Sequence, residues 1–480
     1  MRKSLDKSDL DFLSSIGIGE SEVNSQIEFI NSDTNKKTLV LSRPCLMNDG
    51  LLSYDEINKM PPIHDIDTSS ISRFIPASGS STRMFDFDNS SDTFFKNIKS
   101  LPLFNLLSSY CDRNSIDLSQ IIEDKNLDKL KDILLSQKEM NFASLPKAIL
   151  PFHFLKGIAV TPIEEIILYS LGDIVNSYMW FTIQKTDEEM ILKTLRDSVL
   201  LSEVNFKDFV KFSYQDSATN SLCFDMNKNL VRYDDGRIYT HPSGHGALLG
   251  NLNEVESDYI FINNIDNISP KTRTLRYEIS KILYNVVANT KKQYDMILKT
   301  FIERDYDLLL PSINSIVGTL PDKIKNEAIE KKVDFIIDML NKPIRVCGVV
   351  KDNQSKGGKA FWVFDGNSES VQIVEESQVN MKDKNQKAIW ESGIYFNPVE
   401  MICSLRDFKG DKFDLFEFAE NSLGMKVRKN IFDKESIFVE RPGLWNGCMH
   451  YWHTIFVEIP KACFTPVKNL EDLFLPTHQP

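Results

Sequence analysis

A turn of small residues is the first segment of the chain whose residue types could do chemistry. It reads IPASGSSTRM over residues 75–84 and joins a short apolar run to a segment with helical spacing. Several backbone N–H groups would face one concavity there, and such a turn beside a helix N-terminus cradles phosphate. Arg83 adds a guanidinium that can fork onto phosphate oxygens. The turn lacks the GKS or GKT of a P-loop and the GxGxxG of a dinucleotide fingerprint. Taken alone, it is better explained as an ordinary serine-rich loop.

Two further loops carry residues that could contact a ligand. Lys147 stands between prolines in LPKAILPF (145–152), where a stiff loop would hold its ammonium beside the core and within reach of a phosphate. A lysine that snorkels at a sheet edge is the simpler explanation of that loop alone. In HPSGHG (241–246), two glycines let the backbone approach a ligand, and a plain turn is equally open. His241 and His245 have the spacing of a helical metal pair, but Pro242 and Gly244 disfavour a helix, so the sequence supports a zinc site only weakly.

Asp266 follows a buried-looking apolar run in the segment FINNIDN (261–267). Open α/β sheets place ligand and metal groups at the C-terminal ends of such strands. Mg²⁺ takes one or two carboxylates together with substrate phosphates, so Asp266 suits that role. An Asx-type turn is the alternative explanation.

The elements that must position these loops follow from apolar periodicity. The pattern predicts a strand at 72–75, helices over 90–140, a capped helix at 205–212, a strand at 258–263, helices at 275–287 and 323–340, and a strand-rich part after Pro343. Strands that alternate with helices predict an α/β protein with a mostly parallel sheet. We expect a helical N-terminal extension over 1–70, a core over 71–400 with a helical insertion at about 88–143, and a C-terminal subdomain over 401–480.

Composition limits the partners. The 480 residues include 56 Lys and Arg against 68 Asp and Glu, a formal net charge of -12. That balance argues against a nucleic acid or an anionic membrane as partner, so cations for an anionic substrate must be gathered locally. The sequence shows no signal peptide, no stretch that could span a bilayer, and seven scattered cysteines without a CxxC. We therefore expect a cytoplasmic protein with free thiols. The oligomeric state is not indicated.

The order of the four segments is more informative than any one of them. ASGSSTRM, LPKAILPF, HPSGHG and FINNIDN, in this order, resemble the nucleotidyltransferase pattern of the UDP-sugar pyrophosphorylases. The likeness continues more faintly in VEESQV (374–379) and YFN (395–397). Over its whole length the chain looks still closer to the bacterial domain-of-unknown-function family 4301, which shares FNP (396–398) and PGLWNG (442–447). The resemblance implies a Rossmann-like, GT-A-like nucleotidyltransferase core.

The same resemblance implies roles for individual residues. The nucleotide would be bound by the turn, by a glutamine that reads the uracil edge and by a loop glycine at the base: Ala77, Ser78, Gly79, Ser80, Ser81, Thr82, Gln215 and Gly244. In catalysis, Arg83 would face the leaving β- and γ-phosphates, Lys147 the phosphates and His245 the sugar phosphate. Asp266 would bind Mg²⁺.

Three departures from the family pattern stand out. Ser81 replaces a family glycine, a long segment separates Gly79 from Lys147, and neither a second metal carboxylate nor a late catalytic lysine is evident. Lys359, Lys409 and Lys412 are the candidates for the lysine.

The resemblance implies that UTP or another nucleoside triphosphate reacts with a sugar 1-phosphate to give a nucleotide sugar and pyrophosphate. Positioning and charge neutralisation would then account for catalysis. A nucleotide-binding protein without transfer activity, a glycosyltransferase of the same fold group and, last, a zinc hydrolase remain as alternatives.

Overall fold

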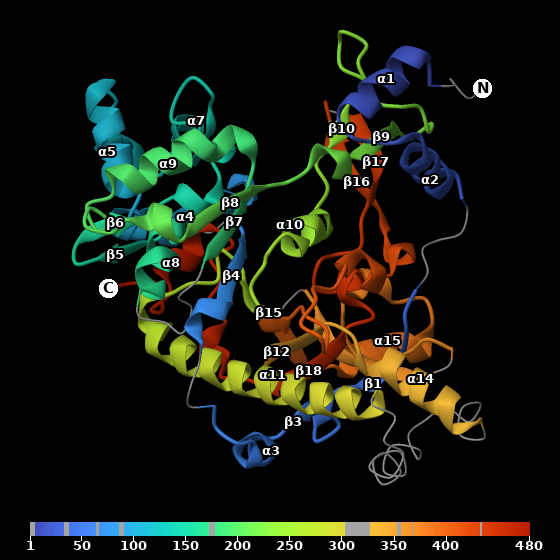
Figure 1. Cartoon of the computed structure of the whole chain (residues 1–480). Coiled ribbons are helices and arrows are strands. Elements are labelled where there is room, and N and C mark those ends of the chain that lie inside the picture. Colours follow the sequence, from blue (N-terminus) through green and yellow to red (C-terminus); the bar gives the residue numbers. More distant parts are fainter. Residues whose placement is uncertain are drawn as a thin grey trace.

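A central sheet organises the molecule. The computed structural model describes residues 5–32, 38–63, 67–85, 91–171, 178–302, 327–352, 357–366, 368–432 and 434–480, without the side chains of residues 83, 91, 301 and 302. Twelve strands of the described chain form the main sheet, and four others form a smaller sheet in a second lobe. Figure 1 shows the two lobes on either side of α10 (Leu249–Asn253).

Nine strands of the main sheet follow one another edge to edge. Their order is β2 (Leu46–Met47), β3 (Gly50–Leu52), β18 (His453–Glu458), β12 (Ile344–Lys351), β15 (Tyr395–Ser404), β11 (Tyr259–Asn263), β4 (Ile71–Pro76), β7 (Met179–Ile183) and β8 (Val210–Tyr214). β11, β4, β7 and β8 run parallel, as do β12, β18 and β3. β15 is antiparallel to both of its neighbours. The predicted α/β fold with a mostly parallel sheet is confirmed.

Three more strands extend the sheet as an antiparallel ribbon. β13 (Lys359–Phe364) pairs with β1 (Val40–Pro44) on one side and β14 (Glu369–Val374) on the other, and it joins β15 through Lys359 and Phe396. Residues before position 70 therefore supply three strands of the main sheet.

The predicted helix at 205–212 is wrong. Phe206–Asp208 forms one 3₁₀ turn, and Val210–Tyr214 is β8. Val210 and Phe212 alternate along the strand and lie opposite Met179 and Phe181 of β7. Aromatic and β-branched side chains fit such a half-buried sheet surface, and this tertiary pairing overrides the local helical spacing.

Helices cover the main sheet on both faces and fill the expected insertion. The insertion contains α4 (Ser91–Asn97), α5 (Phe104–Arg113), α6 (Leu118–Glu123) and α7 (Leu127–Leu135). The lobe that contains this insertion also includes α8 (Pro162–Ser170), α9 (Glu188–Asp197) and the hairpin of β5 (His153–Leu155) and β6 (Ile158–Val160). The long α11 (Arg273–Ile302), with α14 (Ile329–Leu340), runs along the bottom in Figure 1. α15 (Lys384–Ser392) packs beside β1.

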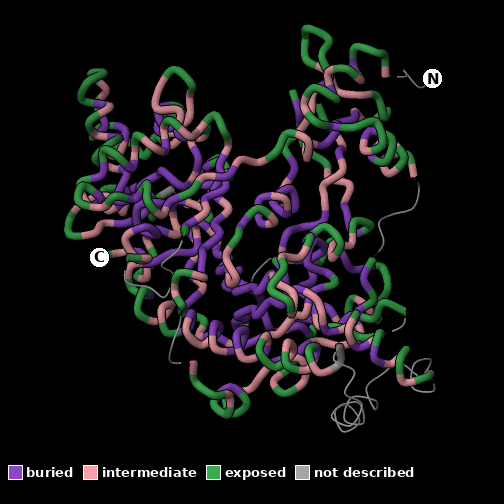
Figure 2. Tube along the Cα trace, in the orientation of Figure 1, coloured by how far each residue is buried: buried purple, intermediate pink, exposed green. Residues whose placement is uncertain are grey.

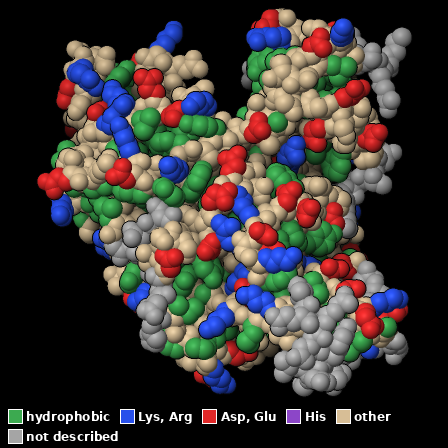
Figure 3. Space-filling view, in the orientation of Figure 1, with side chains coloured by type: hydrophobic (Ala, Val, Ile, Leu, Met, Phe, Trp, Pro, Cys, Tyr) green, Lys and Arg blue, Asp and Glu red, His purple; other side chains and the backbone are tan. Residues whose placement is uncertain are grey.

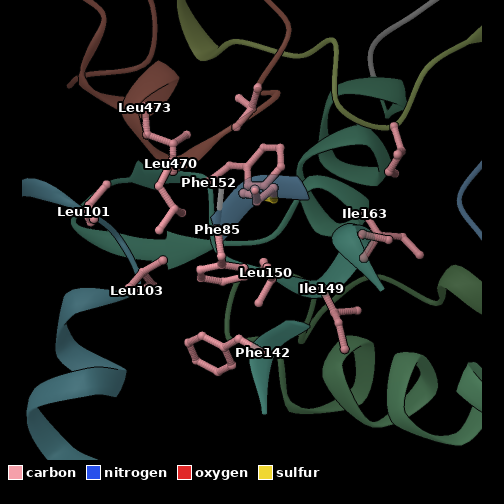
Figure 4. Packing of buried hydrophobic residues seen from close by; sticks show 14 of the residues in the cluster. Phe85, Leu101, Leu103, Phe142, Ile149, Leu150, Phe152, Ile163, Leu470 and Leu473 are labelled. Carbon is pink, nitrogen blue, oxygen red and sulfur yellow. The ribbon is translucent and has the colours of Figure 1, made fainter. Parts of the chain in front are cut away.

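The insertion packs into the core beside the small-residue turn. Figure 4 shows Phe85, at the end of that turn, and Phe142 in one apolar cluster with Leu150. Leu470 and Leu473, close to the C-terminus, belong to the same cluster and pack near Leu101 and Leu103. The helical insertion thus shares one core with the parallel strands, and the last residues of the chain close it.

The second lobe joins three distant parts of the chain. Its sheet has the order β10 (Thr240–His241), β9 (Ser221–Asp225), β17 (Lys434–Glu440) and β16 (Met425–Ile431). α1 (Lys7–Ser15) and α2 (Glu20–Asn31) pack against it through one apolar cluster, and α3 (Tyr54–Lys59) lies at the opposite end of the molecule, below α11 in Figure 1. The central strands of the main sheet, such as β4 and β15, are buried, whereas the loop tips are exposed (Figure 2).

A deep notch separates the two lobes on the face shown in Figure 3. Among the described residues, no helix combines the length and apolar character needed to cross a membrane.

Candidate functional site

Loops with small or polar residues follow the parallel strands at one edge of the sheet. Ala77 comes after β4, Gln184 after β7, Gln215 after β8 and Asn264 after β11. Because these strands are parallel neighbours, their carboxyl ends meet at the same edge, where open α/β sheets bind ligands.

The small-residue turn is attached to the loop that carries Lys147. The N–H of Ser81 donates to the carbonyl of Leu145 (3.0 Å), and the N–H of Lys147 donates to the carbonyl of Gly79 (3.0 Å). The hydroxyl of Thr82 donates to the carbonyl of Ala143 (3.1 Å). These bonds fix the loop of Lys147 beside the turn, although the four helices of the insertion separate the two segments along the chain.

Ser81, which stands where the resembling family has glycine, supports this attachment. The residue is fully buried, and its hydroxyl lies within hydrogen-bond distance of the carbonyls of Phe142 and Leu145. Its side chain is therefore used inside the protein and leaves the outer surface of the turn to backbone groups.

Lys147 and Asp266 meet in a partly buried ion pair. Lys147 Nζ lies 2.8 Å from Asp266 Oδ2, with side-chain exposures of 13% and 25%. The carbonyl of Asp266 also accepts from the N–H of Val467 (2.9 Å), which fixes the loop after β11. The structure thus brings Gly79, Lys147 and Asp266 together, as a phosphate-binding site requires.

The residues around Asp266 fit a magnesium ion that arrives with phosphates. Asp266 supplies one hard oxygen ligand at a strand end, and Mg²⁺ commonly binds to one or two carboxylates and to substrate phosphates. Within the part of the chain that the structure describes, no group of three His, Cys, Asp or Glu side chains could hold a metal ion. The side chain of Arg83 lies outside the described part of the structure; its backbone belongs to the 3₁₀ turn Thr82–Phe85.

Gln215 lies against the HPSGHG loop. Its Nε2 donates to the carbonyl of Ser243 (2.7 Å), and its Oε1 accepts from Nε2 of Gln184 (3.4 Å). A carboxamide has two N–H donors and two lone pairs, so these bonds use half of its capacity. Gln215 and Gly244 thus form a second group at the same sheet edge.

His245 is held in one tautomer by the segment PGLWNG. The N–H of Leu444 donates to His245 Nδ1 (2.8 Å), and the ring stacks on Trp445 at 4.0 Å and 9°. Burial lowers the pKa of His245 to about 4. Because Nδ1 is an acceptor in a neutral ring, we assign the proton to Nε2. At neutral pH this side chain is an uncharged hydrogen-bond donor.

Close approach of the backbone explains the glycines of this loop. A Cβ on Gly246 would lie 2.0 Å from the carbonyl oxygen of Pro442, and a Cβ on Gly244 would lie 2.0 Å from Glu440 Oε1. Only glycine permits the contact at position 246, because the opposing atom belongs to the backbone.

Sequence reasoning left PGLWNG without a role, and the structure gives it one. Besides holding His245, it presents Asn446, whose Nδ2 donates to Glu375 Oε1 (3.1 Å). The fully buried Arg345 donates to the carbonyl of Trp445 and anchors the segment from β12. A tryptophan between glycines was the only sequence signal, and it does not identify the distant partner.

Two of the candidate late lysines have other partners. Lys359 is buried, donates to the carbonyl of Gly393 (3.1 Å) and lies over the ring of Trp390, and burial lowers its pKa. Lys412 pairs with Glu256 at 2.9 Å. Neither contact places these ammonium groups with Lys147 and Asp266.

The fold is that of the nucleotidyltransferases of the UDP-sugar pyrophosphorylase type. A variant of UDP-glucose pyrophosphorylase from Leishmania major in complex with UDP-glucose matches with a TM-score of 0.50 and 12% identity, over 98% of this chain and 79% of that one. UDP-glucose phosphorylase from Trypanosoma brucei has a TM-score of 0.48 and 13% identity, over 97% and 77% of the two chains. The uridine diphosphate N-acetylglucosamine pyrophosphorylase from Trypanosoma brucei, in complex with an inhibitor, has a TM-score of 0.45 and 13% identity over the same shares.

The family follows from sequence. Residues 6–479 match the family model described as Domain of unknown function (DUF4301), so the chain belongs to that family. Among curated proteins, no sequence matches this chain.

Proposed function

We propose that this protein transfers a nucleotidyl group from UTP, or another nucleoside triphosphate, to a sugar 1-phosphate. The products are a nucleotide sugar, with UDP-sugar as the expected form, and pyrophosphate. The observation that carries the proposal is the ion pair between Lys147 and Asp266, whose side-chain atoms lie 2.8 Å apart. The loop that carries Lys147 is also hydrogen-bonded to Gly79 of the small-residue turn. The fold, shared with UDP-glucose pyrophosphorylase, supports it.

The reaction needs positioning more than a base. An oxygen of the sugar 1-phosphate attacks the α-phosphorus, and the bond from that phosphorus to the bridging oxygen breaks to release pyrophosphate. The nucleophile is already an anion, so catalysis consists mainly of alignment and charge neutralisation. Lys147 and the backbone N–H groups of residues 78–80 and 82 would bind the phosphates, with Arg83 beside the leaving group, because the N–H groups of Ala77 and Ser81 already donate to carbonyls of the protein.

Magnesium would be held by Asp266 and by the phosphates themselves, and it would neutralise charge on the triphosphate. In the structure, Lys147 neutralises Asp266. A cation at that carboxylate would release the ammonium toward the phosphates. The pair therefore suits a site in which Mg²⁺ would replace the Lys147 ammonium beside Asp266 as substrate enters.

The second group of residues would select the substrates. Gln215 would hydrogen-bond the uracil edge with the free half of its carboxamide, and Gly244 would let the base approach the backbone. His245 would donate its Nε2–H to the sugar phosphate. These roles explain why one loop, fixed by PGLWNG, carries both Gly244 and His245.

The test is pyrophosphate release from each of four nucleoside triphosphates with a panel of sugar 1-phosphates and Mg²⁺. Lys147→Ala and Asp266→Asn should each lower kcat/KM by about 10²–10⁴-fold, because each removes charge stabilisation at the phosphates. Lys138→Ala and Asp112→Asn change the same charges at exposed positions of the insertion and should retain activity.

The products separate this proposal from its alternatives. Calorimetric binding of a nucleotide without turnover across the panel would point to a binding protein. Release of UDP from a nucleotide sugar would indicate a glycosyltransferase. Wild-type rates in both Lys147→Ala and Asp266→Asn would refute the assignment of the site.

A further inference from the structure

A pocket of about 310 Å³ lies next to the candidate site but is built from other residues. Its lining comes from β4, α8, β15, the start of α11, and β11 with the loop that follows it, and it includes Arg73, Tyr169, Asn267, Arg273, Arg276 and Glu400. Neither Lys147 nor Asp266 is in this lining, nor is any residue of 77–82. The pocket therefore shares only the asparagine loop with the candidate site.

The lining is rich in positive charge. Arg273 and Arg276 stand one helical turn apart at the start of α11, and Glu400 is the carboxylate among the described lining residues. Glu400 is already engaged, because Oε2 accepts from Arg276 Nη1 (2.8 Å) and Oε1 accepts from Asn263 Nδ2 (2.7 Å). One carboxylate thus faces more than one guanidinium in a partly enclosed space, which favours an anion.

The first turn of α11 adds to the positive electrostatic potential in the pocket. α11 has 30 residues, and the positive end of its dipole lies at Arg273 and Thr274, both of which line the pocket. Arg273 is exposed at the surface, where its guanidinium lies 4.8 Å from the centre of the Tyr169 ring. Arg276 is more enclosed, with a side-chain exposure of 16%, and its Nε and Nη2 also donate to Thr272 Oγ1 and to the carbonyl of Cys463, which leaves one N–H of Nη1 for a ligand. An anion would thus meet one guanidinium at the mouth and another inside.

Apolar and aromatic side chains form another part of the wall, beside asparagine, serine and threonine side chains. Ile166, Tyr169, Ile268 and Tyr277 line the pocket together with the two arginines. A volume of this size is at the lower end of the range for small-molecule sites. The combination suits an organic anion of a few carbon atoms better than a bare inorganic ion.

Hydrogen bonds connect the pocket to the loop that carries Asp266. Asn267 Oδ1 accepts from Arg276 Nη2 (3.0 Å) and from the N–H of Thr465 (2.9 Å). A ligand that draws the Arg276 guanidinium toward itself would weaken its bond to Asn267, the neighbour of Asp266. Occupancy of the pocket would then shift the position of the carboxylate that meets Lys147.

We propose that this pocket binds a small organic anion with a carboxylate or phosphate group, held by Arg273 and Arg276, and that its occupancy changes nucleotide affinity at the candidate site. The binding of the anion is independent of the proposed function. The effect of the anion on nucleotide affinity rests on the proposed nucleotide site.

Calorimetry with two probes distinguishes the two anion chemistries. Succinate tests carboxylates, glycerol 3-phosphate tests phosphates, and 1,4-butanediol is the uncharged comparison for succinate. All titrations are repeated in Lys147→Ala, so that binding at the candidate site is removed. We expect at least one anionic probe to bind with a millimolar or lower Kd in both backgrounds, and butanediol not to bind.

A variant that reverses the charge at the mouth of the pocket tests the anion site directly. Arg273→Glu should weaken probe binding by at least about tenfold, because a guanidinium–anion hydrogen bond is lost and repulsion is added. Lys292→Glu makes the same charge change at an exposed position of α11 and should leave the probe Kd unchanged. Arg276→Lys should weaken binding while keeping the positive charge beside Glu400.

The coupling is measured as the Kd of UTP with Mg²⁺ in wild-type protein, with and without saturating probe. A change that Arg273→Glu abolishes is the expected result. Failure of both anions to bind, or equal binding in Arg273→Glu, would overturn the anion site. Probe binding with an unchanged UTP Kd would overturn the coupling, whereas failure of UTP to bind at all would count against the proposed function and leave the probe result standing.

Discussion

His245 is the residue of the candidate site whose protonation state follows most directly from its surroundings. Its pKa of about 4 lies below the ordinary value because burial disfavours the charged ring. The ring is therefore neutral at pH 7. It gains its proton only below about pH 4, and above that pH it can donate from Nε2.

We predict that His245→Ala lowers kcat/KM by about 10–100-fold, the effect of one hydrogen bond to a charged group. His245→Gln should restore part of the loss, because its amide nitrogen reaches the position of Nε2. The pH–rate profile of the wild type should show no inflection from this residue near pH 6.5. An inflection there that disappears in His245→Gln would contradict the assigned neutral state.

Individual residues were predictable where a motif fixes their neighbours. Lys147 and Asp266 come together as the order of motifs implies, and Gln215 lies with the loop of Gly244. The buried role of Ser81 was not predictable, because its partners Phe142 and Leu145 lie beyond the whole helical insertion. The support of His245 by Leu444 and Trp445 depends on a contact across about two hundred residues.

At the scale of elements, the contact between the HPSGHG loop and PGLWNG controls the geometry around His245. Gly246 is the point of closest approach, since a Cβ there would meet the Pro442 carbonyl oxygen at 2.0 Å and its carbon at 2.9 Å. These are backbone atoms of a segment that Arg345 anchors, so they cannot rotate away as a side chain could.

We predict that Gly246→Ala is destabilising by about 1–3 kcal/mol, the usual cost of overpacking. Gly250→Ala is the matched control, because its Cβ would have Phe416 Cζ as its nearest neighbour at 3.7 Å and it lies in helix α10. Thermal melting should show a lower Tm in Gly246→Ala and an unchanged or slightly higher Tm in Gly250→Ala. Equal Tm values in the two variants would show that the loops separate without cost.

Elements were predictable where the apolar pattern is long or strongly buried. β4 and β11 lie where periodicity indicates, because each of these segments reads as one uninterrupted pattern, whereas α11 contains the predicted 275–287 but extends over Arg273–Ile302. β8 was mistaken for a helix, because five residues are too few to separate the two periods without the neighbouring strand β7.

The whole molecule depends on long-range pairing that local sequence does not encode. The small sheet joins β9 to β17, which lie about two hundred residues apart, and residues 40–52 enter the main sheet beside strands from the last third of the chain. Chain order does predict the parallel core, whereas these later additions depend on tertiary partners. Both lobes therefore form only when distant segments meet.

Four histidines, one buried and three partly buried, have lowered pKa values in the described structure. Their pKa values are each lowered to about 4: His241 and His245 by burial, with Lys429 adding to the effect at His241, and His453 and His478 by burial with nearby positive groups. An unfolded chain binds these protons near pH 6.5, whereas the folded chain binds them only near pH 4. Stability from this source is complete above about pH 6.5 and is lost as the pH falls toward 4.

We predict that the protein loses stability steeply on acidification from about pH 6.5 to about pH 4.5, above the pH at which most of its carboxylates are protonated. Each neutral histidine adds to the slope of stability against pH in that window, because the unfolded chain binds a proton that the folded chain does not. Denaturant midpoints from pH 7.5 to pH 4.5 measure the slope. His241→Gln, at the edge of the small sheet, should lower that slope by about a quarter, because one of four titrating groups is removed. A midpoint that stays constant over this window would mean that the four rings are protonated in the folded state, and the neutral His245 assigned to the candidate site would then be wrong as well.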